Sequence, residues 1–211
     1  MGVAERRARE KDEKRQRILD AAAEIILQEG FDKLTVRKLA EKLEYSAGTI
    51  YLYFKDKNEL IFEYCEDAFQ LLLEEMQDLD NPALDPLEAF RASGRGYVRF
   101  ALQNPNAYIV TFCLPPPPEV EGFLEHQTPA GMRCYEILRT LIARCQESGQ
   151  FRPVNLEAAA QSVWFAVHGL ASMLVLCHGH YQMPWASREE LIDTNLDMIE
   201  RGLRADPPNR P

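Results

Sequence analysis

Residues 35–60 read TVRKLAEKLEYSAGTIYLYFKDKNEL, and this stretch decides the expected fold. Residues 35–43 and 46–53 both show the apolar spacing of a short helix, and a turn separates them. Thr35 and Ser46 stand where each helix would need an N-cap. Two short helices joined by a turn form a helix-turn-helix, in which the second helix lies in the major groove of DNA.

The side chains of this stretch divide into an inward and an outward set. Leu39, Leu43, Ile50 and Phe54 supply an apolar seam between the two helices, and Ala40 is small where the helices cross. On the outward side, small residues permit close approach, a threonine suits a base edge, and tyrosine hydroxyls and lysines suit phosphates. The pattern therefore favours a DNA-binding surface over a purely structural helix pair.

The stretch resembles the tetracycline-repressor (TetR) family of bacterial transcription regulators. The resemblance rests on Leu39-Ala40 and on SAGTIYLYFKDKNEL at 46–60, and it extends back to Ile18 and Gly30. One position departs from the family pattern, because Glu44 stands where most members have glycine in the turn. A non-glycine residue in a left-handed conformation costs about 1 kcal/mol, so the fold is expected to survive this change.

The resemblance implies an all-helical homodimer whose two recognition helices read successive major grooves of a pseudo-palindromic operator. Thr49 and Ala47 are then expected at base edges, and Tyr51, Tyr53 and Lys57 at phosphates. The full set of expected DNA-contacting residues is Val36, Arg37, Ser46, Ala47, Gly48, Thr49, Tyr51, Tyr53, Lys55 and Lys57.

Charge is distributed unevenly along the chain, whose formal net charge is −9. Residues 1–60 hold 13 basic and 12 acidic side chains, whereas residues 61–211 hold 11 and 21. All seven lysines lie at or before Lys57. The first part is therefore the one suited to a polyanion, and the acidic remainder is expected to do another job.

Composition places the chain among globular proteins outside the membrane. Its 211 residues are 46% hydrophobic and 27% charged, and we find neither a membrane-spanning apolar run nor a secretion signal. The expected compartment is the cytoplasm. Five cysteines, an odd number without an export signal, predict reduced thiols, although oxidation sensing by Cys65 or Cys113 stays open. We expect no cofactor and no metal, since the Cys177-His178-Gly179-His180 cluster lacks a second set of spaced ligands.

The apolar spacing is helical almost throughout, which predicts an all-α chain of about nine helices. We expect a disordered basic arm over 1–13, a three-helix helix-turn-helix domain over 14–60, a helical ligand-binding and dimerisation domain over 61–204, and a disordered tail over 205–211. Four prolines at 115–118 predict a loop. The arm is a candidate for sequence-independent DNA contacts, and a solvated extension is the alternative.

The segment around Trp164 and His168-Gly169 resembles a common subtype of the TetR carboxy-terminal domain, in which this helix and the next form the dimer interface. His168 could face a ligand or simply pack. Helical spacing gives an apolar stripe, and the expected interface residues are Leu156, Ala160, Val163, Val167, Leu170, Leu174, Leu191 and Leu196.

Aromatic residues and methionines of the second part suit an apolar or aromatic effector, although each one alone could be ordinary core. The candidates are Cys65, Phe69, Tyr97, Phe100, Tyr108, Phe112, Met132, Tyr135, Trp164, Phe165, His168 and Met173. The sequence therefore predicts a repressor that a small molecule releases from operator DNA. The alternatives are an all-helical enzyme and a DNA-binding protein without an effector.

Overall fold

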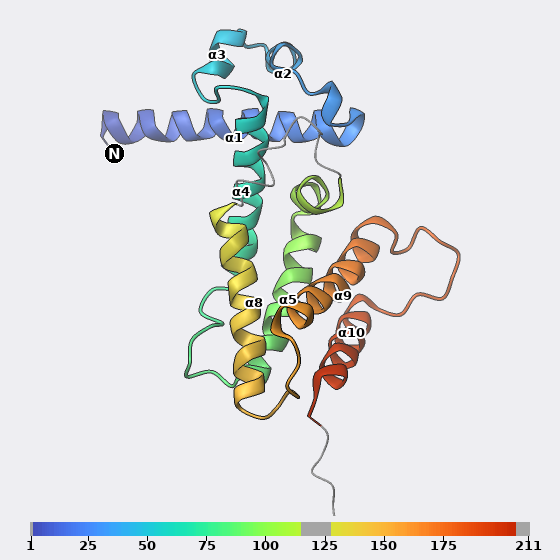
Figure 1. Ribbon diagram of the computed structural model, residues 1–211. Helices are drawn as coiled ribbons and strands as arrows, with labels where there is room; N and C mark the ends of the chain where they lie inside the picture. Colours follow the sequence, from blue (N-terminus) through green and yellow to red (C-terminus); the bar gives the residue numbers. More distant parts are fainter. Residues whose placement is uncertain (1, 115–127, 206–211) are drawn as a thin grey trace, which may run out of the picture. The chain divides into compact units, whose positions relative to one another are not determined.

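The computed structural model describes residues 2–114 and 128–205, without the side chain of Val3. Within these residues it contains nine α-helices and confirms the all-α prediction (Figure 1). The helices are α1 (Val3–Glu29), α2 (Val36–Leu43), α3 (Ala47–Tyr51), α4 (Lys57–Glu75), α5 (Pro86–Gln103), α6 (Pro105–Tyr108), α8 (Pro129–Glu147), α9 (Leu156–Leu176) and α10 (Arg188–Leu203). A 3-10 turn at Phe31–Lys33 and a π-helical turn at Ile109–Cys113 complete the described elements.

The chain divides into two compact units. The first comprises residues up to Ala68 together with 106–114 and Thr128, and the second comprises residues 69–105 and 129–205. The expected boundary at residue 60 is therefore corrected. The first part of α4 and the π-helical turn belong to the first unit because Cys65 and Val110 are buried in its core.

The first unit is built around α1, on which α2 packs, while α3 packs on α2. Ile18, Ala22 and Ile25 recur at helical spacing on α1 and are buried almost completely. The helices that follow start at side-chain caps, since Thr35 accepts a hydrogen bond from the N–H of Lys38. The expected inward residues Leu39, Ile50 and Phe54 are buried in this core, where they fix the helix-turn-helix, and Leu43 packs against it.

The second unit consists of α5, α8, α9 and α10, with α5 in contact with the other three. Glycines on α5 permit two close approaches. A Cβ atom at Gly94 would lie 2.5 Å from Leu196 Cδ2 of α10, and a Cβ atom at Gly96 would lie 2.9 Å from the carbonyl oxygen of Glu75. Since real Cβ atoms need more room, glycine at these positions allows the helices to pack as closely as they do.

Acidic residues of α10 pair with two arginines of α5. Arg91 donates to Asp197 at 2.7 Å and to Glu200, and Arg95 donates to Glu189 at 2.7 Å and to Asp193. These ion pairs lie beside the apolar contact between the two helices. They therefore help to fix the position of α10 on α5.

The expected disordered arm is also corrected, because α1 begins at Val3 and residues 4–13 are helical (Figure 1). Helix formation there needs no new nucleus, since these residues extend an already packed helix. Ion pairs between Arg6 and Glu10 and between Arg9 and Glu13 add i, i+4 support. The proline run at 115–118 and the tail beyond Ala205 lie outside the described residues.

By length and composition alone, α9 could also cross a membrane, and it is the helix in the described ranges that passes this test. It contacts α5, α8 and α10 in the second unit. A core helix of a globular protein shows the same length and composition. The sequence predicted no membrane-spanning run, whereas α9 passes this test; its contacts with three other helices are those of a core helix.

Candidate DNA-binding surface and effector pocket

The recognition helix α3 is held by a cap at its start and by a buried side at its centre. Ser46 accepts a hydrogen bond from the N–H of Thr49 at 3.1 Å, and the hydroxyls of the two residues lie 2.9 Å apart. Ile50 is fully buried and anchors the helix on the core. The remaining faces of this short helix are therefore presented outward in a fixed register.

The outward surface of α3 and its flanks combines small and aromatic side chains. Ala47 and Gly48 are exposed, Tyr51 is 55% exposed and Leu52 is 79% exposed. Leu52 was not among the expected DNA contacts. Its place in the sequence, directly after the expected contact Tyr51, could have indicated that it belongs to the same surface. An exposed leucine in a DNA-reading surface suits the methyl group of thymine.

The other expected contacts are less uniformly exposed. Arg37 and Lys55 are exposed, and Arg37 is paired with Glu41 at 2.9 Å. Val36 and Tyr53 are half-buried and pack against the core of the first unit, so they also serve the fold. Lys57 begins α4 and is half-buried. All ten expected DNA-contacting residues belong to the first unit.

The turn between α2 and α3 has the conformation that the sequence suggested. Glu44 has φ 57° and ψ 34°, which is the left-handed region. The N–H of Tyr45 donates to the carbonyl oxygen of Ala40 at 2.9 Å and closes α2. The glutamate therefore carries the strain that glycine would avoid.

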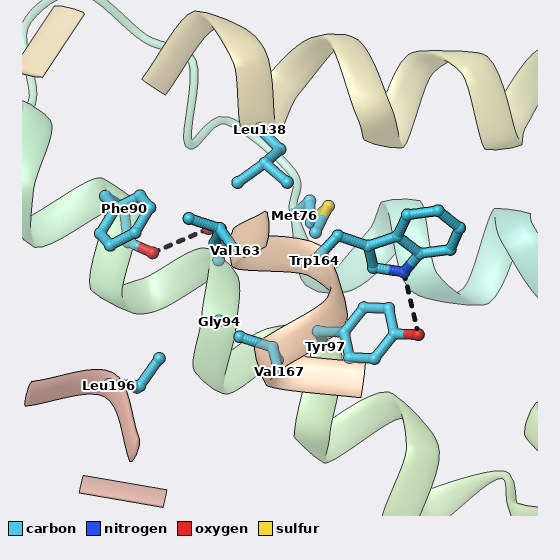
Figure 2. Close-up of a pocket in the computed structure, with 10 residues that line it drawn as sticks. Met76, Phe90, Gly94, Tyr97, Leu138, Val163, Trp164, Val167 and Leu196 are labelled. Atoms are coloured by element: carbon cyan, nitrogen blue, oxygen red, sulfur yellow. Dashed lines mark hydrogen bonds between the residues drawn. The ribbon is translucent and has the colours of Figure 1, made fainter. Parts of the chain in front are cut away.

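The second unit contains a small apolar pocket among α5, α8, α9 and α10, with Met76 just beyond α4 (Figure 2). Its cavity volume is about 30 Å³, which is room for a water molecule or two. An effector can therefore enter only if the lining side chains move apart. The lining residues are Met76, Phe90, Ser93, Gly94, Tyr97, Leu138, Val163, Trp164, Val167 and Leu196.

Polar groups meet at one side of this pocket. The Tyr97 hydroxyl lies 3.1 Å from His168 Nδ1 and accepts a hydrogen bond of 3.4 Å from Trp164 Nε1 (Figure 2 draws the latter). Burial lowers the pKa of His168, so its imidazole is neutral at pH 7. The pocket is thus apolar with one neutral polar corner.

Comparison with known proteins identifies the family. Residues 18–64 match the description "Bacterial regulatory proteins, tetR family", and residues 90–199, more than half of the chain, match "Tetracyclin repressor-like, C-terminal domain". The chain belongs to the TetR family. TetR proteins of this kind are DNA-binding transcriptional regulators, so an all-helical enzyme is no longer the alternative.

Individual relatives agree with this assignment. An HTH-type transcriptional regulator of Haemophilus influenzae is 29% identical over 90 residues, which are 43% of this chain and 48% of the relative. The fatty acid metabolism regulator protein of Bacillus subtilis is 33% identical over 70 residues, which are 33% of this chain and 36% of the relative. The chain thus matches less than half the length of these curated relatives.

Solved structures share the fold across most of the chain. The fatty acid degradation regulator of Bacillus halodurans superposes with a TM-score of 0.72 at 20% identity, and the match covers 90% of this chain and 96% of that one. At this identity the likeness concerns the fold alone. The two chains thus share one helical fold over nine-tenths of this chain.

The expected effector-contacting residues of this TetR protein do not form one group. Only Tyr97 and Trp164 of that set line the pocket, and His168 joins them through Tyr97. Three of the set, Cys65, Tyr108 and Phe112, lie in the first unit. The others lie in the second unit without lining the pocket: Phe69, Phe100, Met132, Tyr135, Phe165 and Met173.

The expected dimer stripe on α9 is corrected. Ala160, Val163, Val167 and Leu174 are at most 6% exposed within the single chain, as is Leu196 of α10. These side chains already pack inside their own subunit, and some of them line the pocket, so they have almost no surface to give to a second subunit. Leu156, Leu170 and Leu191 are half-buried. Five of the eight expected interface residues thus belong to the subunit core, and the three half-buried leucines stay a prediction.

The cysteines and histidines of this TetR protein do not assemble a reactive centre in the described ranges. Burial raises the pKa of Cys65 to about 11, and burial also raises the pKa of Cys113. A protonated thiol is a poor nucleophile, which disfavours oxidation sensing. In the part of the chain that the structure describes, no three metal-ligating side chains come together. His180 Nδ1 instead lies 2.9 Å from the carbonyl oxygen of Leu176.

Proposed function

We propose that this TetR protein is a homodimeric repressor that an apolar small molecule releases from its operator. The observation that carries the proposal is the pairing of an outward-facing recognition helix in the first unit with an apolar pocket in the second. Operator DNA lies in the cytoplasm, which is therefore the proposed compartment. A repressor without an effector is the alternative, and it predicts that no small molecule weakens DNA binding.

The DNA contacts proposed for α3 follow from exposure and chemistry. Ala47 and Gly48 let the helix approach the base edges closely, and Thr49 and Leu52 offer a hydroxyl and an apolar surface to them. Tyr51, exposed beside them, and Lys57 are placed at phosphates. The ten residues named from the sequence remain the proposed set, with Leu52 added.

The effector proposed for the second unit is an apolar molecule with one polar end. The pocket lining is aliphatic and aromatic, and the Tyr97 hydroxyl with His168 offers one polar contact. The name of the Bacillus halodurans neighbour, a fatty acid degradation regulator, supports lipid-derived molecules among the first to try. Of the other named candidates, Phe69, Phe100, Met132 and Tyr135 become relevant only if the pocket enlarges.

The coupling between effector and DNA is proposed to run through α4. Met76, which lines the pocket, follows directly after this helix, and Lys57 is its first residue. The helix begins at Lys57 in the first unit and ends at Glu75 in the second, so we propose that a shift of its end at the pocket reaches Lys57. An effector that binds the displaced state about 100-fold more tightly supplies about 3 kcal/mol of coupling.

The dimer is proposed to form through the outer face of α9, together with α10. Phe165, Gly169, Met173 and Leu176 follow one another at helical spacing, and the three apolar side chains are 43–60% exposed. Among the described residues, no atom beyond the neighbouring backbone of α9 lies within 4 Å of a Cβ atom built at Gly169, so a second helix has room to approach there. Met198 of α10 is 68% exposed. An apolar surface of this kind marks an interface, and a second copy of the chain is the occupant that the Trp/His-Gly subtype would supply.

A DNA-binding titration tests the repressor proposal. An operator duplex is first selected from a random pool with the wild-type protein, and its affinity is then measured by fluorescence anisotropy. The double variant Tyr51→Ala with Lys57→Ala should bind at least about 100-fold more weakly, since each contact to a charged group contributes about 1.5–3 kcal/mol.

A matched control is available in the second unit. Tyr181→Ala with Arg188→Ala also removes one exposed tyrosine and one cation, and it should leave DNA affinity unchanged. If the two double variants bind DNA equally well, the assignment of the DNA-binding surface is wrong.

A ligand screen tests the effector proposal. Acyl thioesters, aromatic compounds and lipophilic cations are screened for a rise in melting temperature, and each hit is tested for release of the operator. Tyr97→Phe should weaken the affinity of a hit three- to tenfold by removing one hydroxyl. Tyr181→Phe is the control, because the Tyr181 side chain is 60% exposed and does not line the pocket. Hits that bind both variants and the wild type equally would refute this pocket.

A further inference from the structure

The amino-terminal part of α1 carries three cations on one face. Arg7, Lys11 and Lys14 follow one another at i, i+4 and i+7, the spacing that places side chains on one side of a helix. All three side chains are exposed. We call these three residues the basic stripe.

The basic stripe continues the face by which α1 joins the core of the first unit. Lys11, Ile18 and Ile25 are seven residues apart along the helix, and both isoleucines are buried together with Leu39 and Ala40 of α2. The stripe therefore lies on the side of α1 on which the helix-turn-helix packs. On the amino-terminal side of Arg15, residues 4–14 are all exposed in the part of the chain that the structure describes.

The other arginines of this segment are engaged within the protein, or lie on other faces. Arg6 pairs with Glu10 at 3.6 Å and Arg9 pairs with Glu13 at 3.4 Å. Arg15 donates to Asp67 at 2.8 Å and to Glu63 at 2.6 Å, which ties α1 to α4. Within the described ranges, the three residues of the basic stripe form no ion pair with an acidic side chain.

An unpaired stripe of like charges is unfavourable for the helix by itself. Cations at i, i+3 and i, i+4 repel each other by about 0.2–0.5 kcal/mol per pair. Alanine or glutamate at one of these positions would relieve the repulsion and keep the helix. The arrangement becomes favourable when an anionic surface lies along it.

We propose that the basic stripe binds the phosphates of DNA that flanks the site read by α3. Arg7 and Lys14 are about 10 Å apart along a helix that rises 1.5 Å per residue, and one DNA strand carries about three phosphates over that length. The contact is electrostatic and independent of sequence. It rests on the proposed function, because it adds a second contact to the same DNA.

Salt dependence of DNA binding tests the proposal. The full-length wild type and the variant Arg7→Gln/Lys11→Gln/Lys14→Gln are titrated onto the selected operator duplex, extended by flanking base pairs, at 50–200 mM salt. Each neutralised phosphate adds about 0.9 to the slope of log affinity against log salt, so the variant should lose about 2.7 per subunit, or about 5.4 for the proposed dimer. The affinity of the wild-type dimer should then fall about 2,000-fold more over this range than that of the variant dimer.

A charge-matched control separates the stripe from overall charge. Arg6→Gln/Arg9→Gln/Arg17→Gln also removes three cations from the exposed part of α1, but from its other faces. Glutamine has nearly the helix propensity of lysine and arginine, and circular dichroism verifies that both variants stay folded. The control should change the slope by less than about 1.

The outcomes are distinguishable from failure of the proposed function. Equal slope changes in the two triple variants would mean that only the number of removed charges matters, not their face on α1. That result would overturn the proposal. Unchanged slopes in both would overturn it as well. A wild-type protein that selects no duplex from the pool would instead contradict the proposed function itself.

Discussion

Replacement of Glu200 by glutamine should loosen the second unit more than any other single charge removal on α10. Glu200 is only 5% exposed and accepts hydrogen bonds from Arg91 of α5 and from Arg204, whose Nε lies 2.8 Å away. The two arginines hold the pKa of this carboxyl below its ordinary value in spite of its burial. The guanidinium groups of both arginines therefore pair with the same carboxylate.

The size of the effect follows from what Glu200→Gln leaves behind. Hydrogen bonds to charged groups contribute about 1.5–3 kcal/mol each, and glutamine keeps one carbonyl acceptor but turns an amide NH₂ toward a guanidinium. Water reaches Arg91 and Arg204 and offsets part of the loss, because their side chains are 30% and 57% exposed. We expect a loss of about 2 kcal/mol, which lowers the melting temperature by about 4–8 °C in a chain of this size.

The assay is thermal and urea unfolding followed by circular dichroism. Glu189→Gln is the control, since Glu189 lies on the same helix and pairs with Arg95, but its side chain is 71% exposed. That variant should lose less than about 0.5 kcal/mol. Equal losses in the two variants, or a Glu200→Gln protein as stable as the wild type, would refute the view that the buried carboxylate fixes α10 on α5.

Four further outcomes are expected. Glu44→Gly should not destabilise the protein and should raise the free energy of unfolding by up to about 1 kcal/mol, because it relieves the left-handed residue at φ 57°; a clear loss in urea unfolding would contradict the strain. Gly96→Ala should destabilise by about 1–3 kcal/mol, because its Cβ atom would meet the carbonyl oxygen of Glu75 at 2.9 Å; wild-type unfolding curves would show that the helices can move apart freely. Gly169→Arg should convert the dimer to a folded monomer in sedimentation measurements, since the proposed interface is open at this position; an unchanged dimer would place the interface elsewhere. Arg91 holds the pKa of Asp197 below its ordinary value, and Arg204 and Arg91 do the same for Glu200 in spite of its burial, so the contribution of these carboxylates to stability is complete above about pH 4.5 and is lost as the pH falls through the folded values; unfolding curves at pH 3–7 that show no such loss would contradict the ion pairs.

Local features of the fold followed from the sequence because local chemistry sets them. Thr35 and Ser46 accept a backbone hydrogen bond at the start of a helix, as predicted, and Asn155 and Ser187 cap α9 and α10 by the same chemistry. The left-handed Glu44 was likewise foreseeable from one missing glycine. The helix-turn-helix depends on such near neighbours, which is why its residues could be named in advance.

Long-range packing was harder to foresee because periodicity gives a face but not its partner. Val163, Val167 and Leu196 fall on apolar faces that suit a dimer equally well, yet they line the subunit's own pocket. Ser93 and Gly94 of α5 also line the pocket. The small size of these two neighbouring residues was a sequence feature that could have indicated the pocket. Val110 is buried in the core of the first unit. The apolar spacing of residues 105–114 does not indicate which of the two units these residues pack against.

The helical structure of the amino-terminal arm was also not predicted from the sequence. Its charged composition suggested disorder, although charge at i, i+4 spacing is compatible with a helix that α1 has already nucleated. The helical form is what turns Arg7, Lys11 and Lys14 from scattered cations into one face.

The most direct test of the account is the affinity of the wild-type protein for its selected duplex against a scrambled duplex of the same length, measured by anisotropy at 150 mM salt. A sequence-reading surface on α3 predicts tighter binding to the selected duplex by at least about 10³-fold. Equal affinity for the two duplexes would contradict the claim that this chain is an operator-specific regulator.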